Sequence, residues 1–356
     1  MFINYLNIVA AVCIILLSEI WAKEFTSYWN IPSFACSHRH KLPLLNVTER
    51  YGILQNVDDN FRGDQISILY DPGLFPALLK NSSSKELFHR NGGVPQKGNL
   101  RAHLEMFQKH VDELIPDKDN SGLAVIDFES WRPVYRQNFG VLQPYKDLSI
   151  KLVKQAHPWW LKNDIENEAK RQFTAAAKLF ILETLSLAKE LRPKAKWGYY
   201  GLPFCFNGRN NVIENCEKNI QVENDGTQWL YDASDVIFPS VYMTEKVTPR
   251  NRPPMVRGRI KESMRLSRNV KRSSKPLVIA YHRYKFTDSL NYLSEADHLG
   301  AIKAMKSTGA DGLILWGAWN DINTKEKCLE FYDYTEKVMG PIIHSSGRSY
   351  SVEEVI

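Results

Sequence analysis

The chain has 356 residues, of which 44% are hydrophobic and 24% are charged, a mixture typical of a globular protein. This composition excludes collagen, a coiled coil and an intrinsically disordered chain. The 46 basic and 40 acidic residues give a net charge of +6 at pH 7, which fits either an acidic partner or ordinary solubility.

The first 22 residues predict a secretory signal peptide. The apolar run over residues 8–17 is too short to span a bilayer as a helix, and the small residue Ala22 follows it at a suitable cleavage position. An uncleaved anchor is the alternative, which the short run disfavours. No later stretch is long and apolar enough to cross a membrane. We therefore expect a secreted, extracellular protein without a stable membrane anchor.

Secretion changes what the cysteines predict. Cys13 lies in the predicted leader, and the four other cysteines are Cys36, Cys205, Cys216 and Cys328. An even number in an oxidising compartment predicts two disulfides, for which three pairings are possible. No Cys-x-x-Cys pair is present, so we expect no zinc site. The sequons at Asn46 and Asn81 are candidate glycosylation sites on a secreted surface.

Short apolar segments that favour strands recur along the chain. They are residues 25–31, 66–70, 123–127, 197–200, 236–242, 277–281 and 313–316. Longer segments separate them, and in two of these, residues 100–114 and 165–187, apolar side chains recur at helical spacing. Strands that alternate with helices predict a parallel sheet, because parallel neighbours need a crossover connection.

About seven such units in one chain favour a distorted TIM-like (β/α) barrel, an α/β fold. A doubly wound open sheet is the alternative, but no strand is followed by a Gly-x-Gly-x-x-Gly or P-loop sequence. The chain has no fixed repeat and no low-complexity linker. We expect a single domain over residues 23–345 and a flexible polar tail over residues 346–356.

The predicted strands end in acidic and aromatic residues. In a barrel, the loops after the C-terminal ends of the strands carry the active site. The residues at these ends are Tyr70, Asp71, Asp127, Glu129, Tyr199, Tyr200, Tyr242, Tyr281, His282 and Trp316. Aromatic rings around a cleft are typical of a carbohydrate-binding groove. The alternative is that these rings simply cap the barrel.

Asp127 and Glu129 are the most informative pair. Residues i and i+2 on a strand project to the same face, roughly 6–7 Å apart. Two crowded carboxyls cannot both ionise readily, so one is expected to keep a proton near neutral pH and act as a general acid. Glycosidases with two catalytic carboxylates place them on opposite sides of the scissile bond. A pair on one strand instead favours a substrate that supplies its own nucleophile.

The segment around these two acids resembles the hyaluronidases, most closely the insect venom and salivary enzymes. The match includes Asp-Phe-Glu-Ser-Trp-Arg-Pro at residues 127–133, Tyr-Asp-Pro-Gly-Leu-Phe-Pro-Ala at 70–77 and Trp-Gly-Tyr-Tyr at 197–200. Pro-Ser-Val-Tyr at 239–242, Leu-Trp-Gly at 315–317 and Asp-Ile-Asn-Thr-Lys at 321–325 also match. The resemblance runs over residues 25–343.

The resemblance implies a secreted endo-β-N-acetylhexosaminidase that cleaves the β-1,4 bonds of hyaluronan, with chondroitin as a second candidate substrate. Glu129 would protonate the leaving oxygen and then activate water. Asp127 would position the substrate's acetamido group, whose carbonyl oxygen attacks the anomeric carbon, so that configuration is retained. No metal or cofactor is needed, because the acid, the amide and a positioned water supply all three roles.

The resemblance also implies which residues line the groove and how the cysteines pair. The groove residues are Tyr200 and Tyr242 around the acetamido group, Trp316 at the wall of the sugar pocket, and Tyr70, Asp71 and Arg132 elsewhere. Arg132 could instead keep Asp127 or a neighbouring acid ionised. The implied disulfides are Cys36–Cys328 and Cys205–Cys216.

The densest basic stretch, residues 250–275, has two interpretations. It is either a patch for glycosaminoglycan or nucleic acid, or a solvated crossover helix. We favour the helix, because Ile260 and Met264 still give it an apolar side. As partner we expect hyaluronan or a related glycosaminoglycan, a polyanion that a basic chain attracts, and no nucleic acid.

Two other functions are compatible with parts of the pattern. A chitinase-like glycosidase also uses Asp-x-Glu and the substrate amide, but its motif has a further Asp where this chain has Val125. A carbohydrate-binding barrel that has lost turnover, such as an allergen, is expected to lack Asp127 or Glu129, and both are present.

Overall fold

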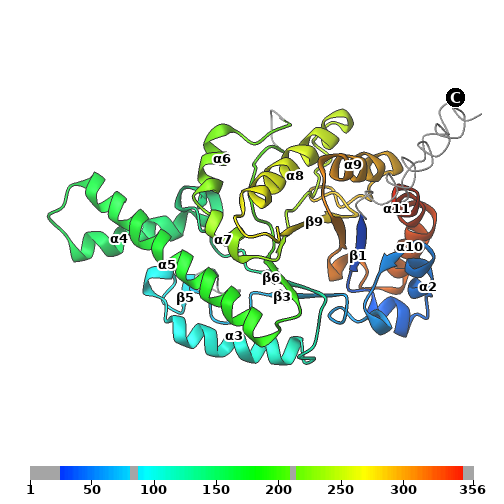
Figure 1. Cartoon of the computed structure of the whole chain (residues 1–356), viewed down its shortest axis with the longest axis horizontal. Coiled ribbons are helices and arrows are strands. Elements are labelled where there is room, and N and C mark those ends of the chain that lie inside the picture. The colour runs from blue at the N-terminus through cyan, green and yellow to red at the C-terminus, as the bar shows by residue number, and fades with distance from the viewer. Residues whose placement is uncertain (1–24, 81–86, 209–213, 348–356) are drawn as a thin grey trace, which may run out of the picture.

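Parallel strands lie at the centre of the molecule and helices cover them (Figure 1). The structure, a computed structural model, describes residues 25–80, 87–208 and 214–347. The strands that match the seven predicted segments are β1 (Thr26–Asn30), β3 (Ile66–Tyr70), β6 (Leu123–Asp127), β7 (Lys196–Tyr199), β8 (Val236–Ile237), β9 (Leu277–Arg283) and β10 (Gly312–Trp316). β8 is shorter than predicted and β9 extends two residues further.

The strands form two parallel sheets that together make a distorted barrel. One sheet has the order β2-β1-β10-β9-β8, where β2 is Ile53–Leu54, and the other has the order β3-β6-β7. Backbone hydrogen bonds join the sheets between β7 and β8, from Gly201 N to Phe238 O and from Asp235 N to Trp197 O, both 2.8 Å. β1 and β3 also approach each other, but in the described part of the chain no ladder joins them.

Alternating side chains on the strands build separate inner and outer apolar layers. The inner layer consists of Ile66, Ile68, Leu123, Val125, Val236, Phe238, Ile279, Tyr281 and Ile314. Ala124 and Ile126 of β6 belong to an outer layer that also contains residues of the helices. The alternation continues from Val125 to Asp127, which therefore lies at the C-terminal end of the barrel interior rather than against the helices.

Helices connect successive strands and form the outside of the barrel (Figure 1). They are α2 (Leu44–Arg50), α3 (Leu100–Leu114), α4 (Gln143–Ala156), α5 (Lys162–Leu191), α6 (Lys218–Asp225), α7 (Gln228–Ala233), α8 (Arg252–Asn269), α9 (Glu295–Thr308), α10 (Lys325–Tyr334) and α11 (Gly340–Gly347). The helical periodicity predicted for residues 100–114 and 165–187 is confirmed, with Phe107 on α3 and Phe173 on α5 fully buried. The hairpin of α4 and α5 projects from the barrel in Figure 1.

An antiparallel hairpin follows β3 and was not predicted. It pairs β4 (Ala77–Lys80) with β5 (Leu87–Arg90), so that Ala77 lies opposite Arg90. Its short strands carry no regular alternation of buried and exposed residues, which explains why no strand was predicted there.

Both disulfides have the pairing that the resemblance implies. Cys36–Cys328 and Cys205–Cys216 have Cα–Cα distances of 5.3 and 5.0 Å. Cys36–Cys328 joins the segment after β1 to α10, and Figure 1 shows these two ends of the described chain side by side. This crosslink spans 292 residues of sequence.

Several sequence predictions concern the ends and the surface of the chain. The predicted leader and the Asn81 sequon lie outside the described residues, whereas Asn46 is exposed on α2. The tail was predicted to begin at residue 346, but α11 continues to Gly347. Ser346 is buried there, and its carbonyl accepts a hydrogen bond from Lys306. In the described ranges, no helix is both long and apolar enough to cross a membrane.

The basic stretch at residues 250–275 contains α8, the crossover helix between β8 and β9, as favoured above. Much of its charge is paired within the chain. The ion pairs are Arg252–Asp297 (2.6 Å), Arg257–Glu214 (2.9 Å), Lys261–Glu214 (2.9 Å) and Arg265–Glu262 (2.8 Å). These internal partners argue against a free basic patch along the helix.

Replacing Cys36 and Cys328 together with alanine is expected to destabilise the fold by about 2–5 kcal/mol, because the unfolded chain loses its longest crosslink. The melting temperature, measured under oxidising conditions, should fall further than in the matched Cys205→Ala/Cys216→Ala variant, whose crosslink spans only 11 residues. An equal or larger loss in the short-loop variant would contradict this explanation.

Candidate active site

Asp127 and Glu129 lie at the end of β6, and their side chains point away from the buried ring of Phe128 between them. Asp127 is the last residue of β6, and its carbonyl accepts a hydrogen bond from Asp71 N (2.7 Å). Phe128 is buried and stacks on Phe75, with ring centroids 4.0 Å apart. Because Phe128 faces the helices, its neighbours Asp127 and Glu129 face the other way, over the end of the barrel. Asp127 is half-buried there, and Glu129 is more exposed, although the pocket residues around it still shield its carboxyl from part of the solvent.

Burial raises the pKa of both carboxyls, and nearby negative charges raise that of Asp127 further. The pKa of Asp127 is raised to about 7, first by burial and then by the negative charges of Glu129 and Asp71. Burial also raises the pKa of Glu129, while the positive charge of Arg132 acts to lower it. Since the two acids titrate as a pair, one proton stays on the pair close to neutral pH. This agrees with the protonated acid that the Asp-x-Glu spacing predicts.

Four aromatic residues at the ends of different strands form an arc over the barrel. The ring centroids of Tyr200 and Tyr242 are 6.2 Å apart, and those of Tyr242 and Trp316 are 5.6 Å apart in a stacked arrangement. Trp316 Nε1 donates a hydrogen bond to the Tyr70 hydroxyl (2.9 Å). The structure thus brings together residues that lie as much as 246 positions apart in the sequence.

Three of the predicted strand-end residues do not belong to this arc. Tyr281 is buried in the barrel interior, where it packs edge-on against Tyr200. His282 is buried and bonded to His298 of α9 (2.9 Å), and the Tyr199 hydroxyl donates to the carbonyl of Ile181. Tyr281 and His282 therefore pack within the barrel and against α9, as the alternative predicted, whereas Tyr199 is held by α5 and also lines the pocket described below.

Asp71 lies close to Asp127, but its carboxylate already has a partner. Arg90 of β5 holds it in a two-pronged contact, with N–O distances of 2.5 and 2.8 Å. Asp71 therefore acts on the site chiefly through its charge, which raises the pKa of Asp127. Sequence reasoning missed Arg90, because only the unpredicted β4–β5 hairpin brings it to this edge.

Arg132 faces Glu129 rather than Asp127. Its guanidinium carbon lies 4.2 Å from the ring centroid of Phe204, and Phe206 and Phe139 flank it at 5.2 and 5.3 Å. Its Nη1 donates to the carbonyl of Gln137 (2.8 Å). Of the two acids that Arg132 was expected to influence, the structure thus favours Glu129, whose pKa the guanidinium charge lowers.

A pocket opens beside Glu129 and Arg132. Its other lining residues are Phe128, Trp131, Pro133, Val141, Leu142, Ile181, Tyr199, Tyr200, Leu202 and Phe204. Asp127, Tyr242 and Trp316 do not line it, so the pocket adjoins the Tyr200 end of the aromatic arc. Among the described residues, no cluster of three His, Cys, Asp or Glu side chains is arranged to hold a metal ion.

Arg259 of α8 supports the arc from behind and was not singled out from the sequence. Its guanidinium donates to the carbonyls of Ser240 (2.9 Å) and Tyr242 (3.3 Å) and to Asn207 Oδ1 (3.1 Å). Burial lowers its pKa to about 10, while the nearby Tyr200 acts to raise it. In the sequence, Arg259 is one of many charges on a basic helix, and nothing distinguishes it.

Comparison with known proteins places this site in a family. Residues 17–349 match the family model described as hyaluronidase. The chain belongs to the hyaluronidase family. Hyaluronidase Tab y 2.0101 of Tabanus yao is 46% identical to it over 327 residues, covering 92% of this chain and 93% of the relative. The hyaluronidase of Apis mellifera is 47% identical over 323 residues, covering 90% of this chain and 84% of the relative.

The fold is also that of a solved family member. The crystal structure of bee venom hyaluronidase in complex with a hyaluronic acid tetramer matches with a TM-score of 0.88 and 46% identity. The match covers 91% of this chain and all of the bee chain. A second, monoclinic crystal structure of the bee venom enzyme matches with a TM-score of 0.85. The predicted family and the predicted distorted barrel are therefore confirmed.

Asp127→Asn is expected to make the protein more stable than the wild type as the pH rises. With its pKa raised to about 7, the folded Asp127 holds a proton that the unfolded chain releases near pH 4. The raised pKa of Asp127 therefore contributes to the free energy of unfolding in full below about pH 4. This contribution is lost as the pH rises through about 7. The difference in melting temperature between variant and wild type should therefore grow across this window, and a constant difference would refute the assignment.

Proposed function

We propose that this chain hydrolyses the β-1,4 bonds of hyaluronan between N-acetylglucosamine and glucuronate, as a retaining, substrate-assisted enzyme. The observation that supports this most strongly is the pair Asp127 and Glu129, which keeps one proton at the edge of a cleft walled by aromatic rings. The proposal also rests on family membership and on the bee venom relative whose structure contains a hyaluronic acid tetramer.

In the first step, the proton of the pair is delivered to the substrate. The N–H of the substrate's acetamido group donates to Asp127, which favours the ionised form of Asp127 and leaves the proton on Glu129. Glu129 gives that proton to the glycosidic oxygen as the bond from this oxygen to the anomeric carbon breaks. The acetamido carbonyl oxygen attacks the anomeric carbon from the other face, forming an oxazolinium ion whose positive charge the ionised Asp127 stabilises.

In the second step, Glu129, now ionised, takes a proton from a water molecule. The resulting hydroxide equivalent attacks the anomeric carbon from the side that the leaving sugar vacated, and the ring C–O bond of the oxazolinium opens. Two inversions give net retention, and Glu129 is again protonated for the next cycle.

The aromatic arc would hold the sugar that carries the acetamido group. Tyr200 lies close enough to Asp127 and Glu129 for their charges to act on it, and burial raises the pKa of both Tyr200 and Tyr242, so the two phenols stay neutral hydrogen-bonding groups. Trp316, fixed by its hydrogen bond to Tyr70, offers a flat apolar wall for the pyranose ring. Hyaluronan and chondroitin both have an acetamido group on a pyranose ring, which are the groups that these residues would contact. Chondroitin is therefore a second candidate substrate.

We further propose that the protein is secreted. Its two disulfides are typical of an oxidising compartment, the first 22 residues have the pattern of a leader, and the bee relative is a venom protein. A chitinase-like reaction has less support, because Val125, at the position of that motif's additional Asp, is buried in the barrel interior.

Glu129→Gln is expected to lower the rate of hyaluronan cleavage at least about 100-fold, because the amide neither donates nor accepts the transferred proton. The change keeps the shape of the side chain, so the melting temperature should stay close to that of the wild type. Chain length would be followed by gel electrophoresis or viscometry.

The matched control is Glu105→Gln, which removes an exposed carboxylate on α3 and should leave the rate unchanged. Wild-type protein that leaves hyaluronan at its original length would reject the enzymatic proposal in favour of a carbohydrate-binding barrel. Cleavage of chitin oligomers without cleavage of hyaluronan would favour the chitinase-like reaction.

A further inference from the structure

The pocket beside Glu129 lies where the leaving half of the substrate must lie. Glu129 is the proton donor of the proposed reaction and lines the pocket, whereas Asp127, which holds the acetamido sugar, does not. Of the residues on the acetamido side, Tyr200 borders the pocket, whereas Tyr242 and Trp316 are absent from the lining. The side of Glu129 that faces away from Asp127 therefore receives the sugar whose oxygen is protonated.

The chemistry of that sugar sets a requirement. In a β-1,4 bond of hyaluronan, the leaving oxygen is O4 of a glucuronate, and the carboxylate sits on the neighbouring ring carbon. Each cleavage event therefore brings one carboxylate next to the oxygen that Glu129 protonates. Unless a positive group faces this carboxylate, it repels Glu129 once that residue has given up its proton.

Within the described residues, Arg132 is the positive group whose charge acts on Glu129. It is close enough for its charge to lower the pKa of Glu129, yet no ion pair of 4.0 Å or less joins the two side chains in the described structure. Among the described residues, its guanidinium makes one side-chain hydrogen bond, from Nη1 to the carbonyl of Gln137. The other N–H groups of the planar fork are suited to a two-pronged contact with a carboxylate.

The surroundings of Arg132 hold it in place before substrate arrives. Phe204 packs on its guanidinium face, and Asn224 of α6 donates to the carbonyl of Phe204 (3.0 Å) and to Glu262 of α8 (2.7 Å). Glu223 accepts a hydrogen bond from Nε2 of Gln137 (3.2 Å), the residue whose carbonyl Arg132 contacts. One short helix thus ties both segments that contact Arg132 to the barrel.

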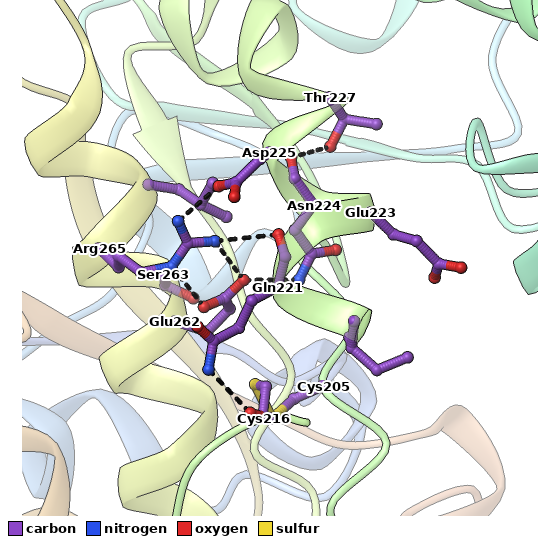
Figure 2. A network of polar contacts seen from close by, with 12 residues as sticks. Cys205, Cys216, Gln221, Glu223, Asn224, Asp225, Thr227, Glu262, Ser263 and Arg265 are labelled. Carbon is purple, nitrogen blue, oxygen red and sulfur yellow. Dashed lines mark hydrogen bonds and ion pairs between the residues drawn. A yellow bond between two sulfur atoms is a disulfide. The ribbon is translucent and has the colours of Figure 1, made fainter. Parts of the chain in front are cut away.

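Figure 2 shows how this helix is anchored. Glu262 and Arg265 of α8 point toward Asn224, and Arg265 also contacts Asp225 and the carbonyl of Gln221. Glu223 points away from this network, consistent with its contacts to the Gln137 segment. The Cys205–Cys216 disulfide lies at the end of the same network, where Gln221 donates to the carbonyl of Cys216 (2.8 Å). A rigid guanidinium loses little freedom on binding a carboxylate.

We propose that Arg132 binds the carboxylate of the leaving-side glucuronate and makes the enzyme select cleavage sites that are followed by a uronate. This inference rests on the proposed function and specifies one of its subsites. It also gives a physical reason for rejecting chitin-like chains. Their leaving sugar has no carboxylate to pair with the remaining N–H groups of the Arg132 guanidinium.

The test uses hyaluronan in which about half of the glucuronates have been reduced to glucose. Cleavage sites before glucuronate and before glucose are then equally abundant, so the ratio of the products reports the preference of the enzyme. Each cleavage makes the leaving-side sugar the new non-reducing end of a product. Mass spectrometry of the products therefore shows whether glucuronate or glucose occupied the leaving-side subsite. Wild-type protein should cut before glucuronate roughly 10- to 100-fold more often than before glucose, the range expected for hydrogen bonds to a charged group.

Arg132→Met keeps the apolar stem against Phe204 but removes the fork, so its new ends should reflect the composition of the polymer. Arg132→Lys keeps the charge without the fork and should retain an intermediate preference, and it serves as the second variant if the methionine form folds poorly. The control is Arg101→Met, which loses the same charge at an exposed site on α3 and should cut like the wild type.

The possible results separate the two proposals. Wild-type protein that cuts before glucose and glucuronate equally, or Arg132→Met protein with the wild-type preference, would overturn the role of Arg132 while leaving the enzyme assignment intact. A loss of preference in Arg101→Met as well would assign the selectivity to overall charge and also overturn it. Wild-type protein that cuts neither this polymer nor unmodified hyaluronan would reject the proposed function itself.

Discussion

The crowding of two carboxyl groups at the end of β6 is the interaction on which the rest of the site depends. Strand alternation turns Asp127 and Glu129 away from the anchored ring of Phe128, so both acids lie over the C-terminal end of the barrel. Burial raises the pKa of both acids, and repulsion from Glu129 and Asp71 raises that of Asp127 further, which keeps a proton available where a leaving group needs one. The neighbouring charges fit this arrangement, because Arg90 holds Asp71 and the aromatic cluster holds Arg132.

This crowding is unfavourable for stability, and long-range contacts hold the site in place. The carbonyls of the segment that carries Tyr242 are held by Arg259 from α8, and the pocket wall at Phe204 is held by Asn224 from α6. The Cys36–Cys328 disulfide joins the first and last parts of the barrel, on either side of β1 and β10, which pair along five residues. Rigid support of this kind lets a site keep groups that would otherwise move apart or ionise.

The sequence predicted the features that depend on neighbouring residues, but not those that depend on contacts between distant segments. The seven strands and the Asp-x-Glu pair are local patterns, and the structure contains both. Tyr281 and His282 were placed at the rim because β9 was expected to end at residue 281, whereas it continues to Arg283, so that Tyr281 packs in the barrel interior and His282 contacts α9. Arg90, Arg259 and Phe204 acquire their roles only through contacts between distant segments, which no local pattern reveals.

The titration of Asp127, followed by NMR with carbon-13 in the aspartate carboxyls, tests the central claim most directly. Wild-type protein should show one aspartate that titrates near pH 7, and its pKa should fall in Glu129→Gln, because the negative charge that opposes its ionisation is gone. An Asp127 that titrates near its ordinary value of about 4 in both proteins would contradict the claim that the two acids share a retained proton.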